Sequence, residues 1–149
     1  EPPTTYEKQV CDAITGLGSQ AVHHGFTPYD EVRTHQELAA ICIVPSIWEE
    51  PAGLTVIEAL SAGAALITTN RGGIPETATG RAIIVDILAC REDSAKITEI
   101  FASQLRCLIT DETKRTDLQD RAWQDYPFGA KIMSNKADKV RISVLEAKI

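Results

Sequence analysis

Long hydrophobic runs are missing from the sequence. The longest apolar stretch is AAICIV at residues 39–44, whereas a helix that crosses a bilayer needs roughly 20 apolar residues. No leader of the secretory kind, with a charged and then an apolar part, follows Glu1. We therefore expect no membrane-spanning helix and a location in the cytoplasm.

Paired cysteine spacings and clustered metal ligands are missing as well. The cysteines occur singly, at positions 11, 42, 90 and 107, which predicts reduced thiols rather than a zinc site or a thioredoxin-like pair. No Asp-x-Asp pair occurs in the chain. His23 and His24 adjoin and would face opposite sides of a strand, so they form no metal-binding set. We expect neither a metal nor a cofactor.

An excess of basic residues is also absent. The chain has 15 Lys and Arg against 21 Asp and Glu, a formal charge of −6, and this balance opposes nonspecific attraction to nucleic acid. Its 149 residues are 44% hydrophobic and 24% charged, the composition of a protein with one ordinary core. We expect no nucleic-acid partner and one main domain at residues 1–126.

Helical and strand patterns alternate along the sequence. Strands are predicted at residues 20–26, 40–46, 64–70 and 81–86. Helices are predicted at residues 5–18, 28–39, 54–63, 94–110 and 112–125, with a short helix within 70–80. This alternation predicts an α/β fold, namely a Rossmann-like three-layer domain with a mostly parallel sheet.

Residues 127–149 carry a separate amphipathic pattern. Met133, Ala137, Val140 and Val144 form an apolar stripe at helical spacing, with basic residues elsewhere around the helix. The pattern predicts a C-terminal helix that packs on this domain or on another domain of the same protein. Peripheral contact with an anionic membrane surface is the alternative, because basic amphipathic helices bind such surfaces.

The loop that follows the predicted strand 40–46 is the main candidate for a ligand site. Ligands of parallel α/β sheets bind beyond the carboxyl ends of the strands. In PSIWEEPAGLT, Pro51 and Gly53 shape a turn, and the backbone N–H groups at residues 53–55 begin a helix whose positive end favours a phosphate. Glu58 lies one turn further on, and its side chain leans back toward this helix start.

Two carboxylates, Glu50 and Glu58, therefore flank the predicted anion site. Acidic groups repel phosphate but accept hydrogen bonds from hydroxyls. A nucleotide sugar supplies hydroxyls on both sides of its diphosphate, so one glutamate would hold the hexose and the other the ribose. Glu49 is interpreted as a solvated loop residue. For Glu76, a loop-closing role and a ligand contact remain equal alternatives.

The run PSIWEEPAGLTVIEALSAGAALITTNRGGIPE at residues 45–76, with HHGFTPYDEV at 23–32 before it, resembles a known family. The shared marks are the Pro-Ser before the turn, the two glutamates with seven residues between them, the Gly-Leu-Thr helix start and the Gly-Gly-Ile-Pro-Glu run. They are similar to the C-terminal, donor-binding half of the retaining glycosyltransferases of GT-B architecture. The family is the large fourth one, glycosyl transferases group 1, which includes lipopolysaccharide and cell-envelope hexosyltransferases.

The resemblance implies roles for individual residues. Glu50 would be the catalytic-site glutamate that contacts hydroxyls of the transferred sugar, and Glu58 would hold the ribose hydroxyls. The backbone facing the sugar and the β-phosphate would belong to Ala52, Gly53, Leu54 and Thr55. Phe26 and Thr27 would lie near the nucleobase. The donor would be a nucleoside diphosphate sugar, with a UDP-sugar as the first expectation.

The resemblance also implies partners outside this sequence. Family members carry an N-terminal acceptor domain and two further donor-domain strands, so we expect this chain to be the C-terminal part of a longer enzyme, inactive alone. The acceptor glycan or glycolipid would bind the other domain, at the inner face of the membrane, and the missing strands would allow self-association. The alternative of another class is a non-catalytic nucleotide-binding Rossmann-like module or half of a nucleotide-sugar epimerase.

Overall fold

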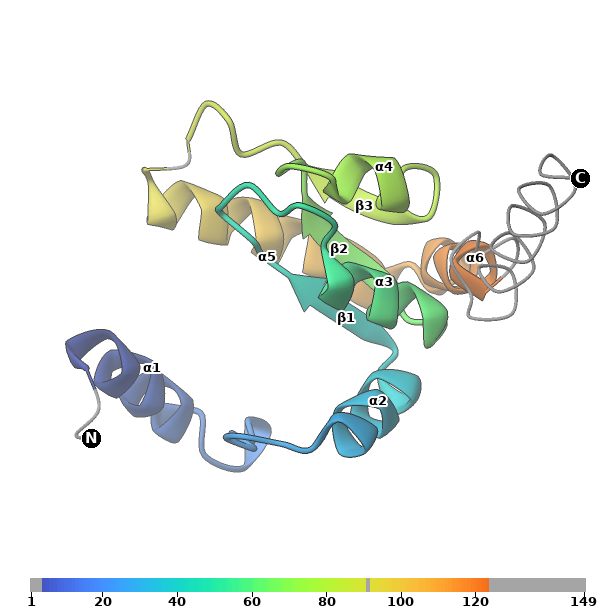
Figure 1. Cartoon of the computed structure of the whole chain (residues 1–149). Coiled ribbons are helices and arrows are strands. Elements are labelled where there is room, and N and C mark those ends of the chain that lie inside the picture. Colours follow the sequence, from blue (N-terminus) through green and yellow to red (C-terminus); the bar gives the residue numbers. More distant parts are fainter. Residues whose placement is uncertain (1–3, 91, 124–149) are drawn as a thin grey trace, which may run out of the picture. The chain divides into compact units, whose positions relative to one another are not determined.

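Helices and strands alternate in the computed structural model, which describes residues 4–90 and 92–123 (Figure 1). The elements are α1 (Thr5–Gly16), the short 3-10 helix η1 (Gly18–Gln20), α2 (Tyr29–Leu38), β1 (Ile41–Val44), α3 (Leu54–Ser61), β2 (Ala65–Thr69), α4 (Ile74–Ala78), β3 (Ala82–Val85), α5 (Ser94–Thr110) and α6 (Glu112–Trp123). The chain divides into two compact units, one up to Val32 and the other from Arg33. The second unit contains the sheet.

A capping box defines the start of α1 in the first unit. The backbone N–H of Thr4 donates to Glu7 Oε2 at 2.7 Å, and the Thr4 hydroxyl accepts from the Glu7 N–H at 3.2 Å. The hydrogen bond from the Thr4 backbone lowers the pKa of Glu7 below its ordinary value. No residue of α1 is buried. The position at which this helix begins therefore follows from the cap rather than from packing.

The strand predicted at residues 20–26 is wrong. Gln20 ends η1, and residues 21–28 have no regular secondary structure. Val22 and Phe26 are exposed, so the apolar residues of this segment have no buried face. A strand needs a neighbour for its N–H and C=O groups, and the apolar content that predicts a strand does not guarantee that neighbour.

The other three predicted strands form a parallel sheet in the order β1-β2-β3. Ile41 is in register with Ala65, and Leu66 with Ala82. All five residues of the central strand β2 are buried, Thr68 and Thr69 included, because helices cover both faces of the sheet. The Rossmann-like α/β fold with a parallel sheet is confirmed.

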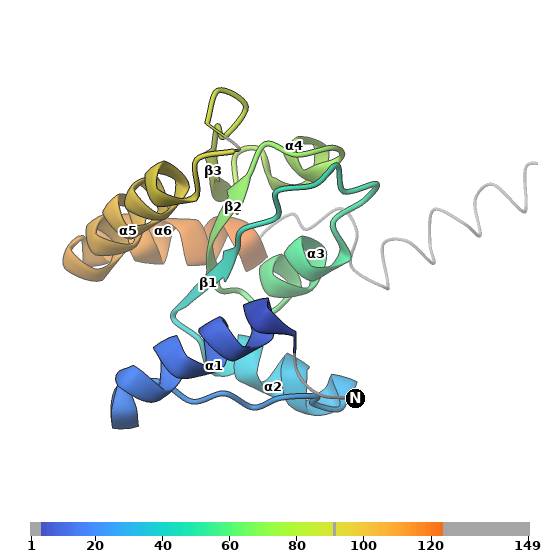
Figure 2. The same ribbon diagram turned by 90° about the vertical axis from the view of Figure 1, so that its left-hand side faces the viewer.

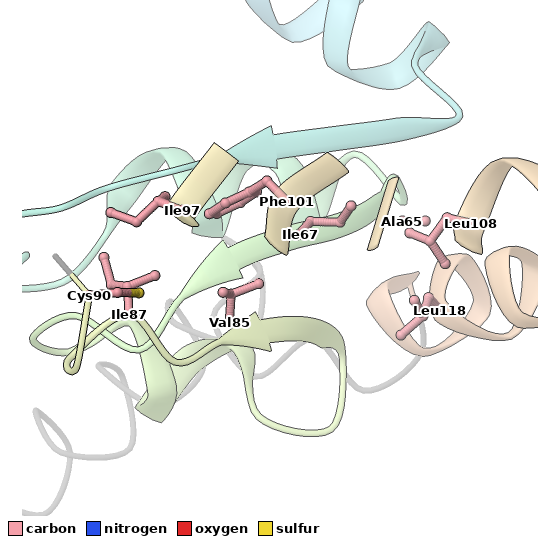
Figure 3. Close-up of a cluster of buried hydrophobic side chains, with 9 residues drawn as sticks. All are labelled: Ala65, Ile67, Val85, Ile87, Cys90, Ile97, Phe101, Leu108 and Leu118. Carbon is pink, nitrogen blue, oxygen red and sulfur yellow. The ribbon is translucent and has the colours of Figure 1, made fainter. Parts of the chain in front are cut away.

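Helices cover both faces of the sheet, with α5 on one side and α3 and α4 on the other (Figure 2). Alternate side chains of β2 point to opposite faces. On one face, Ala65 and Ile67 belong to a cluster with Phe101 of α5 (Figure 3). On the other face, Leu66 packs with a cluster that includes Leu60 of α3. The carboxyl edge of the sheet is thus held between two packed layers.

Two predictions from the sequence lie beyond this description. The C-terminal helix predicted within residues 127–149 falls outside the described residues, and the domain limits at 126 and 127 stay predictions. None of the described helices is both long and apolar enough to cross a membrane.

We predict that Ile67→Ala destabilises the sheet-containing unit by about 2–5 kcal/mol, because it leaves a cavity between β2 and α5. Ile67 is fully buried, whereas Ile109, on α5, is 60% exposed and provides the control. Ile109→Ala should change the free energy of unfolding by no more than about 0.5 kcal/mol. Urea unfolding followed by circular dichroism measures both, and equal effects would contradict the assigned core.

Candidate functional site

Three loops follow the carboxyl ends of the three parallel strands, at the edge where ligands bind in such sheets (Figure 1). They are residues 45–53 after β1, 70–73 after β2 and 86–90 after β3. The buried hydroxyl of Thr69 donates to the carbonyl oxygen of Ser46 at 2.6 Å, and that of Thr68 donates to Val44 at 3.0 Å. These bonds connect β2 to the beginning of the first loop.

The N-terminus of α3 is open at the end of the first loop. Gly53 occupies the N-cap position and offers no side chain that could accept a hydrogen bond from the first turn. The N–H groups of Leu54, Thr55 and Val56 therefore have no side-chain cap. Ala52 and the side chains of Leu54 and Thr55 are exposed. The helix start presents free donors and a positive dipole end on an accessible surface.

Glu58 lies one turn into α3 and is half-buried. Within the part of the chain that the structure describes, its carboxylate has no hydrogen-bond partner. Helical side chains point back toward the helix N-terminus. The carboxylate is therefore available as an acceptor close to the open helix start, where the sequence predicts it.

Glu50 is held in place by its neighbours in the first loop. Its Oε1 atom accepts hydrogen bonds from the Ser46 hydroxyl at 3.0 Å and from the Trp48 indole N–H at 2.8 Å. Its backbone oxygen accepts from the N–H of Gly73 at 2.7 Å. No described residue donates to Oε2. One carboxylate oxygen thus fixes the side chain and the other can meet a ligand.

Glu49 is an exposed loop residue, as predicted, but its carboxylate also has two partners in the second loop. Its Oε1 pairs with the guanidinium of Arg71, and its Oε2 accepts from the N–H of Gly72 at 2.7 Å. Arg71 is only 2% exposed, and a buried cation needs a counter-charge. Sequence reasoning missed this pair, although Arg71 lies two positions after the end of the buried strand β2 and adjoins the Gly-Gly turn. That position is the signal that could have found it.

The loops 45–53 and 70–73 meet backbone to backbone. Gly72 has a left-handed backbone, with φ of 55°, and an added Cβ would lie 2.2 Å from the Glu50 carbonyl oxygen. A Cβ on Gly73 would lie 2.5 Å from the carbonyl oxygen of Pro51. Side chains at these two positions would push the loops apart. The Gly-Gly pair is therefore what permits the contact that positions Glu50.

Asp86 connects the third loop to the second one. Its Oδ1 accepts from the backbone N–H of Leu88 at 3.0 Å and from Asn70 Nδ2 at 2.7 Å. The hydrogen bond from Leu88 makes the largest contribution to lowering the pKa of Asp86 below its ordinary value. The hydrogen bond from Asn70 and the charge of Arg71 lower this pKa further. Asn70 in turn accepts from the N–H of Ile87 at 3.3 Å. The loops after β2 and β3 form one connected edge.

A pocket of about 410 Å³ lies among these loops. It is lined by Ile47, Trp48, Glu49, Arg71 and Glu92. Residues 4–90 and 92–123 contain no group of three or more His, Cys, Asp or Glu side chains that could hold a metal ion. The charged side chains that line the pocket are Glu49, Arg71 and Glu92, and Arg71 is paired with Glu49.

Phe26 and Thr27 belong to the first unit, and the other predicted site residues belong to the second. Phe26 is fully exposed, and the Thr27 hydroxyl donates to the carbonyl oxygen of Gly25 at 3.3 Å. Their assignment to a nucleobase stays a prediction. Glu76, in the first turn of α4, is exposed.

Comparison with known proteins identifies the family. Residues 4–124 match the profile of the family described as "Glycosyl transferases group 1". The chain belongs to this family. The resemblance seen in the sequence is therefore confirmed at the level of the family.

Two curated relatives overlap this group 1 chain in part. It is 34% identical to a lipopolysaccharide 1,2-N-acetylglucosaminetransferase of Salmonella typhimurium over 71 residues. These residues make up 48% of this chain and 19% of that protein. It is 31% identical over 87 residues to a Bacillus subtilis protein named "Putative glycosyltransferase YtcC", which covers 58% of this chain and 20% of that one. The chain thus matches about a fifth of the length of each relative.

We predict that Gly72→Ala destabilises the group 1 chain more than Gly80→Ala does. Both glycines have positive φ, 55° and 80°, but a Cβ on Gly80 would meet no atom within 4 Å. Strain in the left-handed region should cost about 1–2 kcal/mol at either site, and the clash with Glu50 should add about 1–3 kcal/mol at Gly72. Urea unfolding of the two variants measures the difference, and equal losses would refute the backbone contact.

We also predict that Asp86 makes a pH-dependent contribution to the free energy of unfolding. Because its pKa is lowered from the ordinary 3.8 in the folded state, the ionised form stabilises the fold fully above that value. The stabilisation is lost as the pH falls through the folded pKa. Asp86→Asn keeps the shape and removes the charge, so wild type should exceed it in unfolding free energy at neutral pH but not at a pH of about 2. A difference that does not change with pH would contradict the assignment.

Proposed function

We propose that the chain is the donor-binding part of a retaining glycosyltransferase that moves a hexose from a nucleoside diphosphate sugar to an acceptor glycan or lipid-linked glycan. The observation that carries the proposal is the N-terminus of α3, which has no side-chain cap, with Glu50 before it and Glu58 one turn after it. The Glu58 carboxylate has no hydrogen-bond partner among the described residues. Membership of glycosyl transferases group 1 supports sugar transfer. The name of the Salmonella relative supports a role in lipopolysaccharide assembly.

The diphosphate would bind at the start of α3. The N–H groups of Leu54 and Thr55 are donors without a side-chain cap, and the helix dipole favours negative charge there. Breaking the sugar–phosphate bond increases the negative charge on the β-phosphate. Donors fixed at that position would stabilise the transition state more than the ground state, which is the condition for catalysis.

The two glutamates would hold the groups on either side of the diphosphate. Glu58, which has an unengaged carboxylate, would accept hydrogen bonds from the ribose diol. Glu50 would accept from hydroxyls of the transferred sugar through Oε2, because Oε1 is already engaged by Ser46 and Trp48. The sugar would keep its anomeric configuration if the acceptor attacks from the face that the diphosphate leaves, with the leaving diphosphate assisting this attack. The scheme requires no metal and no cofactor, and a UDP-sugar is the first donor to test.

We predict that Glu58→Ala weakens binding of the matching donor among UDP-, GDP- and ADP-sugars roughly 10- to 100-fold. The variant loses charge-assisted hydrogen bonds of about 1.5–3 kcal/mol. Isothermal titration calorimetry of the whole chain measures the change. Glu99→Ala, which removes an exposed acid on α5, is the matched control and should bind like wild type.

A 2′,3′-dideoxy analogue of the same nucleotide separates the ribose role from a general electrostatic one. Wild type should bind the analogue as weakly as Glu58→Ala binds the normal donor, and the mutation should then have little further effect. If Glu58→Ala leaves donor affinity unchanged, or weakens the analogue as much as the donor, the ribose role is wrong.

A further inference from the structure

Arg71 is a buried cation at the carboxyl edge of the sheet. It follows the fully buried strand β2 by two positions, and it is 2% exposed. Its Nε atom is buried and has no hydrogen-bond partner among the described residues. A guanidinium that is buried to this degree retains its charge, so the surrounding structure has to supply an anion. Glu49, on the neighbouring loop, supplies it.

Both carboxylate oxygens of Glu49 bind residues of the second loop. One oxygen pairs with Arg71 and the other accepts from the Gly72 N–H. Its side chain is nevertheless 65% exposed, so the pair lies at the surface end of a buried cation. Because the charge of Arg71 is already matched by Glu49, Arg71 is not a free counter-ion for a phosphate. The pair has a different use.

The residue after Glu49 is Glu50, and the same two loops fix it. Its backbone oxygen accepts from Gly73, next to Gly72, and its side-chain Oε1 accepts from the Trp48 indole. The first loop is therefore attached to the second at two successive residues. Moving the backbone at Glu50 would therefore break the Gly73 hydrogen bond or the pair of Glu49 with Arg71.

We infer that Glu49 and Arg71 are positioning residues that set the direction of the Glu50 carboxylate, and with it the fit of the sugar part of the donor. The consequence for the donor rests on the proposed function, whereas the orientation of Glu50 does not. In this role neither residue needs to contact the donor. They act through the loop backbone and through the Trp48–Glu50 hydrogen bond.

A purely structural role gives a different expectation. If the pair only neutralises a buried charge, removing both charges together should restore the native site, since a buried ion pair is often replaceable by apolar side chains. If the pair positions Glu50, the double variant Glu49→Gln with Arg71→Met should recover stability while Glu50 stays misplaced. Glu49→Gln alone should lose stability as well as orientation.

The Trp48 indole provides a readout that needs no ligand. The chain has two tryptophans, Trp48 and Trp123, so its ¹H–¹⁵N spectrum contains two indole signals, which Trp48→Phe assigns. In both the single and the double variant, the Trp48 indole and the Gly73 amide signals should move, while the Trp123 indole signal stays. Glu99→Gln is the matched control and should move none of the three. Unmoved Trp48 and Gly73 signals in the stable double variant would overturn the inference.

Donor binding provides the second readout. The double variant should bind the free nucleoside diphosphate as wild type does, but its preference for the nucleotide sugar over that diphosphate should fall about tenfold, the effect of one misdirected hydrogen bond. An unchanged preference would overturn the link to the donor. If wild type itself shows no preference for any nucleotide sugar, the proposed function fails, while the indole signal still decides whether Glu49 and Arg71 orient Glu50.

Discussion

The site depends on one close approach, that of the backbone at residues 72–73 to the backbone at residues 50–51. Carbonyl oxygens of the first loop occupy the space where Cβ atoms of the second would stand. This approach lets the Gly73 N–H reach the Glu50 oxygen and brings Glu49 to Arg71. The position of the acidic turn, and therefore of the start of α3, follows from a contact that only residues without side chains can make.

The electrostatics of the edge follow from the same contact. The chain is acidic overall, and the buried cation Arg71 is already paired with Glu49. Within the described residues, the N-terminus of α3 is therefore the feature of this turn best suited to an anion, because its donors are uncapped and its dipole is fixed. Fixed dipoles need no reorganisation when charge develops, and this suits a leaving phosphate better than a mobile lysine would.

Local patterns in the sequence predict much of this arrangement. Apolar runs mark β1, β3 and the first half of β2, because a strand covered on both faces is mostly apolar. The Gly-Leu-Thr start and the spacing of Glu58 predict the helix face on which this glutamate lies. The same reasoning fails at residues 20–26, where apolar content without a pairing neighbour gives no strand. It also misses the pair of Glu49 with Arg71, because residues 22 positions apart meet only through the register of β1 with β2.

The arrangement separates the part of the site that must stay fixed from the part that can vary. Glu49, Gly72 and Gly73 are engaged with backbone or buried groups, so changes there disturb the loops themselves. Ala52 and Leu54 are exposed at the same turn and make none of these bonds. Under the proposed function, related enzymes could therefore change the donor sugar at position 52 while the loops that hold Glu50 remain unchanged.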